Sequence, residues 1–349
     1  MIDFRYHLVS IVAVFLALAI GIVLGSTELQ GNTIDVLRTS SNSLKNQLGQ
    51  TQAERNTLQQ ELSSDQAFIA TAEPRLLAHE LPGMRIVVVT EPGASSTVIS
   101  GVKQAALQAG ATVTGQVAIQ PKFNDLSGTT QSSLSQINSD LATADNTSLA
   151  TPANEQTLDQ QQAAQLIGTA ILATTTAGET TGISTADATT LLGAYAQAGY
   201  ITITPAVTNR ATLAVIVTPD TAPADGQNDP GTQVLLAMAQ EFAGESAATV
   251  VVGSTAGSSP TGSPIAALRA SSVASLVSTV DNADTIVGQV STIWALAEQL
   301  RGQKPNSYGI SGASAVSPVP LPVPSATPTV SPTPHATQTG KGDKSVKKK

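Results

Sequence analysis

The feature that most constrains this chain is an apolar run close to its N-terminus. Leu8–Leu24 reads LVSIVAVFLALAIGIVL, seventeen residues with one Ser and no charge. As a helix the run is roughly 26 Å long, which is just enough to cross the hydrocarbon core of a bilayer. A cleaved secretory signal is the alternative, because Gly25 offers a small residue for cleavage. We favour an uncleaved anchor, since Arg5 is offset by Asp3 and signals usually have a more basic lead. Either interpretation exports the rest of the chain.

A heptad repeat follows the apolar run, from Thr33 to Ala72. One seam position holds Ile34, Ser41, Leu48, Arg55, Leu62 and Ile69, and the other holds Leu37, Leu44, Thr51, Leu58, Asp65 and Ala72. Eight of these twelve positions are apolar, and the residues between them are nearly all polar. The pattern predicts a coiled-coil stalk that ends at Pro74 and makes the chain a homo-oligomer. The alternative is one amphipathic helix folded back on the globular domain, because Arg55 and Asp65 weaken the seam.

Beyond Pro82 the pattern changes to strands that alternate with helices. Arg85–Thr90 is a predicted buried strand, followed by a turn, a helix to Ala109 and a second strand at Thr112–Ile119, which together form a βαβ unit. Further helices are predicted at Gln131–Ala142, Gln156–Leu172, Thr185–Ala198, Gly231–Ala243 and Asp284–Leu300. Further strands are predicted at Tyr200–Ile203, Leu213–Val217 and Thr249–Gly253. This alternation predicts a mostly parallel sheet flanked by helices. The Ala/Thr-rich stretch 143–181 is left open as a helical insertion.

The predicted fold class is therefore α/β, with an N-terminal transmembrane helix, a coiled-coil stalk and a disordered C-terminal tail. The predicted domains are 1–27, a transmembrane anchor or uncleaved signal; 28–80, the stalk; 81–310, the α/β domain; and 311–349, a tail rich in Pro, Ser and Thr. The tail ends in five lysines between residues 341 and 349. These lysines fit a contact with acidic envelope polymers or lipid head groups, and a solvated end explains them equally well.

The composition of the chain argues against one class of partner and excludes chemistry that depends on cysteine. The formal net charge of −8 argues against nucleic acid as a partner, because phosphate binding needs a clustered basic surface. The absence of cysteine excludes disulfides, thiolate metal sites and thiol nucleophiles.

No residue is assigned as catalytic, cofactor-binding or metal-binding. The turn Gly253–Gly257 is the closest match to a nucleophile turn, but it lacks a base. His7, His79 and His335 all lie outside the predicted sheet, so a His-dependent triad cannot be drawn. We predict a protein that is not an enzyme.

Two glycine-containing loops deserve mention as weak candidates for anion binding. Glu91–Ser96 and Gly253–Gly262 each follow a predicted strand, but neither has the Walker pattern nor the glycine spacing of a dinucleotide site. Plain strand-to-helix loops are the favoured interpretation. Asp220, Asp225 and Asp229 do not have the spacing of an EF-hand and are interpreted as an acidic surface loop.

The sequence also argues against a tight copper site within one chain. Soft Cu(I) is held by Cys and Met, and Cu(II) by His. Here Cys is absent, and Met1, Met84 and Met238 are scattered.

The N-terminal block MIDFRYHLVSIVAVFLALAIGIVLGS, followed by the Leu heptads, resembles the actinobacterial copper transporter family. The strand MRIVVVTEP, the turn Ala198–Thr202, and Ser278–Asn282 with Tyr308–Gly309 after the last predicted helix fit the layout of the same family. The resemblance covers roughly residues 1–310 as a pattern match and leaves the Pro-rich tail out.

The resemblance implies a non-enzymatic cell-envelope protein of copper homeostasis that assists copper efflux, with copper ion as the transported species. It implies a single-pass protein whose α/β domain lies outside the cytoplasm, at the inner or the outer membrane. One apolar helix cannot enclose a pore, so a channel would need several copies. The alternative is an envelope scaffold with no direct copper role, whose sheet domain binds a cell-wall polymer or an envelope protein.

Overall fold

The computed structural model describes residues 4–145, 147–149, 157–173, 175–176, 179–180, 183–205, 209–223, 225–257, 262–312, 315 and 317–318. Its helices are α1 (Phe4–Leu77), α2 (Ser96–Gln108), α3 (Gly128–Asp145), α4 (Leu158–Ile171), α5 (Thr185–Gln197), α6 (Pro230–Glu245), α7 (Pro264–Ala270) and α8 (Ile286–Leu300), with short 3-10 turns η1 (Pro121–Asn124), η3 (Gly226–Asn228) and η4 (Ser272–Ser275). Its strands are β1 (Arg85–Thr90), β2 (Thr112–Ile119), β3 (Thr175–Thr176), β4 (Glu179–Thr180), β5 (Ile201–Ile203), β6 (Leu213–Val217), β7 (Ala248–Val252), β8 (Ser278–Val280) and β9 (Ser307–Tyr308). The predicted α/β class is confirmed. Residues 319–349, on which most of the predicted tail falls, lie outside the described residues.

The main sheet is doubly wound about β1. Its strand order is β5-β2-β1-β6-β7-β8-β9, and every pairing is parallel except that of β5 with β2. The chain first moves from β1 through α2 to β2, and later returns to the other side of β1 with β6, β7 and β8. The order of the strands therefore reverses between β1 and β6. In open α/β sheets, ligands bind beyond the carboxyl ends of the strands at such a switch point.

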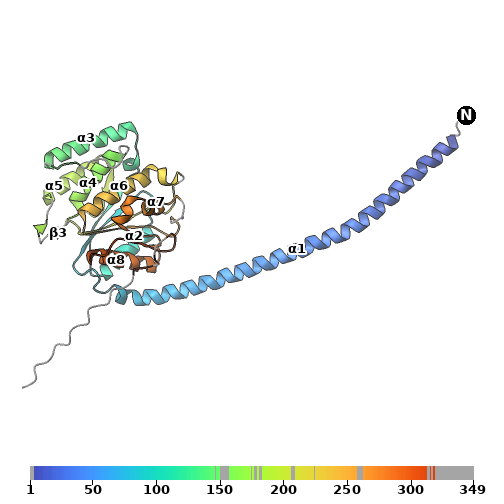
Figure 1. Ribbon diagram of the computed structural model, residues 1–349, viewed down its shortest axis with the longest axis horizontal. Helices are drawn as coiled ribbons and strands as arrows, with labels where there is room; N and C mark the ends of the chain where they lie inside the picture. Colours follow the sequence, from blue (N-terminus) through green and yellow to red (C-terminus); the bar gives the residue numbers. More distant parts are fainter. Residues whose placement is uncertain are drawn as a thin grey trace, which may run out of the picture. The chain divides into compact units, whose positions relative to one another are not determined.

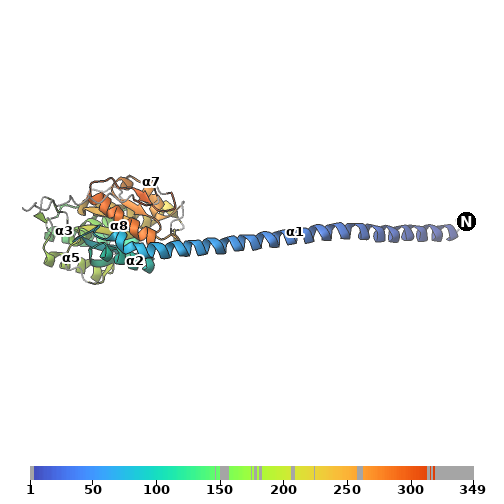
Figure 2. The same ribbon diagram turned by 90° about the horizontal axis from the view of Figure 1, so that it is seen from below.

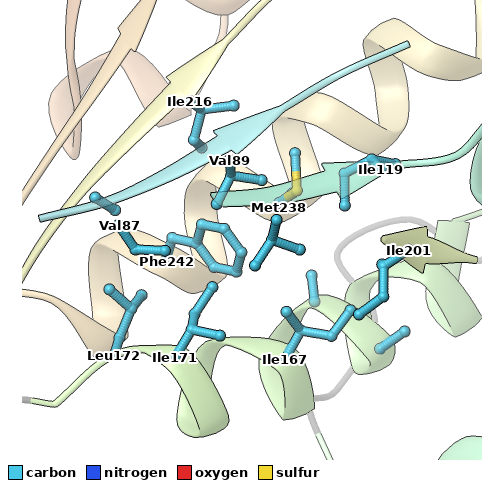
Figure 3. Close-up of a cluster of buried hydrophobic side chains, with 14 of the residues drawn as sticks. Val87, Val89, Ile119, Ile167, Ile171, Leu172, Ile201, Ile216, Met238 and Phe242 are labelled. Carbon is cyan, nitrogen blue, oxygen red and sulfur yellow. The ribbon is translucent and has the colours of Figure 1, made fainter. Parts of the chain in front are cut away.

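Helices cover both faces of this sheet, as Figure 1 shows. Val87 and Val89 of β1 face a core shared with α4, α5 and α6, whereas Val88 of the same strand faces a core shared with α2 and α8. The alternation follows from the period of two in a β-strand. Figure 3 shows the first core, in which Phe242 and Met238 of α6 pack against strand and α4 side chains.

Helix α4 settles the question about the Ala/Thr-rich stretch. Leu166, Ile167 and Ile171 of α4 are fully buried in the same core as β1 and α6, so this helix is part of the domain rather than an insertion. The helix α7, the strands β8 and β9, and the β3–β4 hairpin were not predicted, since all four are too short to show a clear period.

Helix α1 runs from the apolar segment to the α/β domain without a break, as Figure 2 shows. Arg5–Gly25 is long and apolar enough to cross a membrane, and none of it is buried; a signal sequence near the N-terminus would have the same properties. At its other end Leu77 is fully buried in the core of α2 and α8, and the indole nitrogen of Trp294 donates a 3.2 Å hydrogen bond to the Leu76 carbonyl oxygen.

The heptad stretch was predicted to end at Pro74, and the helix itself runs a little further. The helix continues to Leu77, with Pro74 inside its last turn. A proline ring removes one intrahelical hydrogen bond and crowds the preceding turn. Here the burial of Leu77 against α8 offsets that cost and holds the last turn in place.

Candidate functional site

A small cavity lies at the switch point of the sheet. It has a volume of about 210 Å³ and is lined by the loop after β1, the loop after β6, the end of η1 and the start of α6. Glu91 comes from the first loop, Asn124 from η1, and Asp229 and Thr232 from α6. Glu91, Asn124 and the Asp229–Thr232 turn are far apart in sequence, and the fold of the sheet brings them to one edge.

The cavity is notable for polar oxygens that lack a hydrogen-bond partner. Within the described residues, Glu91 Oε1, Asn124 Oδ1 and Thr232 Oγ1 are buried without one. Glu91 is only 4% exposed and Thr232 only 1%. A buried polar atom left without a partner destabilises the fold by roughly 1–3 kcal/mol, so native proteins rarely keep several together. All three atoms belong to residues that line this one cavity.

The electrostatics of Glu91 are unusual. Burial, and after it the nearby charge of Asp229, raises the pKa of the Glu91 carboxyl to about 8. The carboxyl is therefore mostly protonated at neutral pH. A buried carboxylic acid with a strongly raised pKa in a cavity is a recognised sign of a binding or reaction site.

The start of α6 is fixed by its own cap. Asp229 accepts a hydrogen bond from the backbone N–H of Thr232 at 3.1 Å through Oδ2, and its carbonyl oxygen accepts one from Gln233 N at 3.1 Å. Pro230, at the first helical position, has no N–H. Gly231 lets Asn124 approach this helix end, since a Cβ there would lie 3.0 Å from Asn124 Nδ2.

The turn that most resembled a nucleophile site is a structural cap. Ser254 is buried, and its Oγ accepts a hydrogen bond from Gly257 N at 3.2 Å. Thr255 N and Oγ1 both donate to Asp284 Oδ1, at 2.8 and 2.9 Å. In the loop after β1, Ala94 N donates to the Glu91 carbonyl oxygen. These N–H groups are used inside the loops, which favours the plain strand-to-helix interpretation.

Across the described ranges, no three His, Cys, Asp or Glu side chains gather where they could hold a metal ion. Met238 is buried in the core beside Phe242, and the Met84 sulfur accepts a weak hydrogen bond from Thr212 at 3.8 Å. His79 lies just after α1 with a φ of 65°. Met1 and His335 lie outside the described residues.

Glu91 and Asp229 were expected in separate loops, and neither their proximity nor the contribution of Asn124 and Thr232 to one cavity was predicted. The available signal was a carboxyl directly after the buried strand VVVT. This signal identifies the cavity only if β6 is known to pair with β1. The residues of the two strands do not indicate that pairing.

Taken together, the fold defines a doubly wound α/β protein with a small polar cavity at the switch point and a long N-terminal helix that begins in an apolar segment. The chain belongs to the family described as "Copper transport outer membrane protein, MctB", whose model matches residues 1–320. The resemblance seen in the sequence is thereby confirmed.

Curated relatives agree with this assignment. The proteins named Copper transporter MctB in Mycobacterium tuberculosis and Mycobacterium bovis are each 30% identical to this chain over 320 residues, which is 91% of the chain and 98% of the relative. The Mycobacterium leprae protein of that name is 29% identical over 324 residues, covering 91% of the chain and 99% of the relative.

Proposed function

We propose that this chain is a non-enzymatic component of copper homeostasis in the cell envelope that assists copper efflux as a homo-oligomer. The observation that carries the proposal is the family match, which spans residues 1–320. The relatives are named copper transporters, and they match this chain over nearly their whole length.

The exposed apolar surface of α1 supports the membrane and oligomer parts of the proposal. Arg5–Gly25 is unburied and apolar, as an anchor in lipid requires. Leu44, Leu48, Leu58 and Leu62 of the heptad seam are between 58% and 67% exposed. A second copy of the helix would cover these side chains in a coiled coil. We place the α/β domain outside the cytoplasm, at the far end of this stalk.

A role in conduction would belong to the assembly rather than to one chain. The described residues hold one candidate membrane span, and one helix cannot enclose a path for an ion. They also bring no metal-ligand cluster together. Copper is proposed as the transported ion or as an ion moved by a partner, and not as a resident cofactor.

The test is copper handling in a strain that lacks the gene. We expect higher cellular copper and lower copper tolerance than in the wild type, with zinc content unchanged, and we expect the intact gene to restore both. Metal content is read by mass spectrometry of washed cells, and tolerance by growth across a copper series.

The second candidate is an envelope scaffold whose α/β domain binds a cell-wall polymer or an envelope protein. It is favoured by the same exposed stalk, and the described residues form no group of three His, Cys, Asp or Glu side chains that could hold a metal ion. If the deletion strain becomes sensitive to detergent while its copper content stays at the wild-type level, the scaffold role holds and the copper role is wrong.

A further inference from the structure

We propose that the cavity at the β1–β6 switch point binds a small organic cation of the alkylammonium type, held by Glu91, Asn124, Asp229 and Thr232. The site is independent of the copper role. It rests on the unpartnered oxygens of the cavity, on its acidic charge, on the capped N-terminus of α6 and on the proline rings that line it.

The first argument is the kind of bonding that the cavity lacks. The unpartnered atoms of Glu91, Asn124 and Thr232 are all oxygens. The Asn124 amide oxygen, and the Glu91 carboxylate once it is ionised, only accept hydrogen bonds, so a ligand that satisfies both must donate. An ammonium group has up to three N–H donors and no acceptor, and it matches this set.

The second argument is charge. Glu91 and Asp229 are both acidic, and the residues that line the cavity include no Lys, Arg or His. Lys122 of the neighbouring η1 is engaged elsewhere, with its Nζ 2.9 Å from the Ala198 carbonyl oxygen and above the Tyr200 ring. Within the described residues, this acidic pair thus has no basic counter-charge at the cavity. A cationic ligand would supply one.

The third argument excludes anions. A helix N-terminus at a switch point normally attracts phosphate or carboxylate through its free N–H groups. Here Asp229 takes the N–H of Thr232, and Pro230 has none to give. An anion would meet the Asp229 carboxylate at the helix end that should bind it. The cavity therefore differs from the phosphate sites found at this position in nucleotide-binding folds.

The fourth argument concerns the walls, which separate an organic cation from a metal ion. Four proline rings line the cavity, from Pro92, Pro219, Pro223 and Pro264. A bare metal ion needs oxygen or nitrogen ligands on every side, and three acidic or imidazole ligands do not meet in the described residues. An alkylammonium ion places its charged end on the oxygens and its short carbon chain on the prolines. At about 210 Å³ the cavity is smaller than a drug-sized pocket, so the chain must be short.

Binding should be linked to proton release. Asp229 is the other acidic residue that lines the cavity, and its charge raises the pKa of Glu91. Asp125 follows η1, Asp220 follows β6, and Glu241 and Glu245 lie further along α6. A cation binds best to the ionised carboxylate. With a pKa of about 8, the ionised fraction of Glu91 rises about tenfold between pH 7 and pH 9, so affinity should rise by the same factor.

The experiment uses the purified full chain in detergent micelles, with n-propylammonium as the probe and calorimetry as the measurement. We expect binding at pH 9 that weakens about tenfold at pH 7. Glu91→Gln should remove this pH dependence and most of the affinity, because a neutral amide of the same size stays at the site. Asp140→Asn, at an exposed acid on α3, is the matched control and should bind as the wild type does.

Thr232→Val tests whether the unpartnered Thr232 hydroxyl contacts a ligand or is only a buried group without a hydrogen-bond partner. Valine keeps the shape of threonine and removes the unpartnered hydroxyl, so the variant should unfold at a higher denaturant concentration than the wild type. The same variant should bind n-propylammonium several-fold more weakly. Higher stability with unchanged binding would mean that Thr232 does not contact the ligand and would overturn the assignment.

Three other outcomes would overturn the proposal. One is no heat of binding for n-propylammonium up to roughly 10 mM at pH 9 in a folded sample. Another is equal binding of glycerol, which would show that hydroxyl groups rather than positive charge are recognised. The last is binding of Ca²⁺ that Glu91→Gln abolishes while n-propylammonium has no effect, which would make the site a metal site.

Discussion

Large aliphatic side chains are buried in the α/β domain and exposed on helix α1. In the domain Val88 and Ile216 are fully buried, because sheet and helices from one chain close over them. In α1 Leu44 and Leu58 are 67% and 63% exposed. Burying a leucine is worth roughly 1.5–3 kcal/mol, so the domain gains its stability from its own chain and α1 does not. We therefore expect α1 to be stabilised only when lipid or a second copy of the helix covers its apolar side chains.

A second contrast lies inside the domain, between two polar clusters at the same edge of the sheet. At β8 the buried Asp281 is fully bonded: it accepts from Arg269 Nη1 at 2.8 Å, from Ile310 N at 2.7 Å and from Ser311 N at 2.9 Å. At β1 Glu91 has a buried oxygen with no partner among the described residues. The first cluster stabilises the fold, and the second is left incomplete for a ligand.

The largest effect should come from breaking the complete cluster. Asp281→Ala leaves the Arg269 guanidinium buried without its carboxylate and frees two backbone N–H groups. Loss of one partner of a buried ion pair typically destabilises by about 3–5 kcal/mol, and we expect that loss here. Urea unfolding followed by circular dichroism measures it. Asp140→Ala, at an exposed acid, should change the free energy of unfolding by less than about 0.5 kcal/mol. A similar small loss for Asp281→Ala would mean that the two clusters do not differ as described.

The incomplete cluster should respond to pH in the opposite way to most acidic residues. The folded Glu91 carboxyl keeps its proton up to a pKa of about 8, whereas the unfolded one releases it near 4.5. Unfolding between these values therefore releases a proton, and rising pH lowers the free energy of unfolding. Water that enters the cavity reduces the effect, and we expect a fall of roughly 2–4 kcal/mol from pH 5 to pH 8.

The comparison with Glu91→Gln isolates this contribution. The variant cannot titrate at this position, so its stability should fall less over the same pH range. Unfolding in urea at four pH values gives both curves. Parallel curves for the wild type and the variant would show that Glu91 titrates normally in the folded protein.

The strands of the sheet could be predicted from the sequence, whereas the cavity could not. The strands Arg85–Thr90 and Leu213–Val217 were located correctly, because runs of buried β-branched residues have a strong local signal. The cavity could not be predicted, because Glu91 and Thr232 meet only once β6 is placed beside β1. Whether an oxygen has a partner depends on packing, and no local pattern records it. The last turn of α1 beyond Pro74 depends on packing in the same way, since the burial of Leu77 offsets a local helix breaker.

Two C-terminal truncations should have a smaller effect on the free energy of unfolding, and they distinguish the end of the domain from the tail. Ser311 O accepts from Arg269, and Ala315 N donates to the Ser307 carbonyl oxygen at 3.2 Å. Removal of residues 311–349 cuts these bonds and should lower the free energy of unfolding by about 1–3 kcal/mol. Removal of residues 319–349 alone should leave it unchanged, because a Pro-rich segment is not expected to add to a core. Differential scanning calorimetry of both truncations makes the comparison. A large loss with the shorter truncation would show that the tail packs on the domain.

The smallest effect on domain stability should come from the heptad seam, and this test bears most directly on the contrast between α1 and the domain. Replacing Leu44, Leu48, Leu58 and Leu62 by Gln removes four of the eight apolar seam residues while keeping good helix formers. The free energy of unfolding of the α/β domain should change by less than about 0.5 kcal/mol, because these side chains are more than half exposed and belong to none of the buried core clusters. The mass in light scattering of the detergent-purified chain should fall from oligomer to monomer.

A matched control removes the same number of polar side chains from outside the seam. Replacing Ser43, Asn46, Asn56 and Gln60 by Ala alters exposed positions of α1 and should leave the mass unchanged. If the Leu variant remains an oligomer, the chains associate through another surface, and the exposure of these leucines needs a different partner. If it becomes a monomer and its domain also loses stability, α1 contributes to the fold of its own chain, and the division between the two regions is less sharp than their burial indicates.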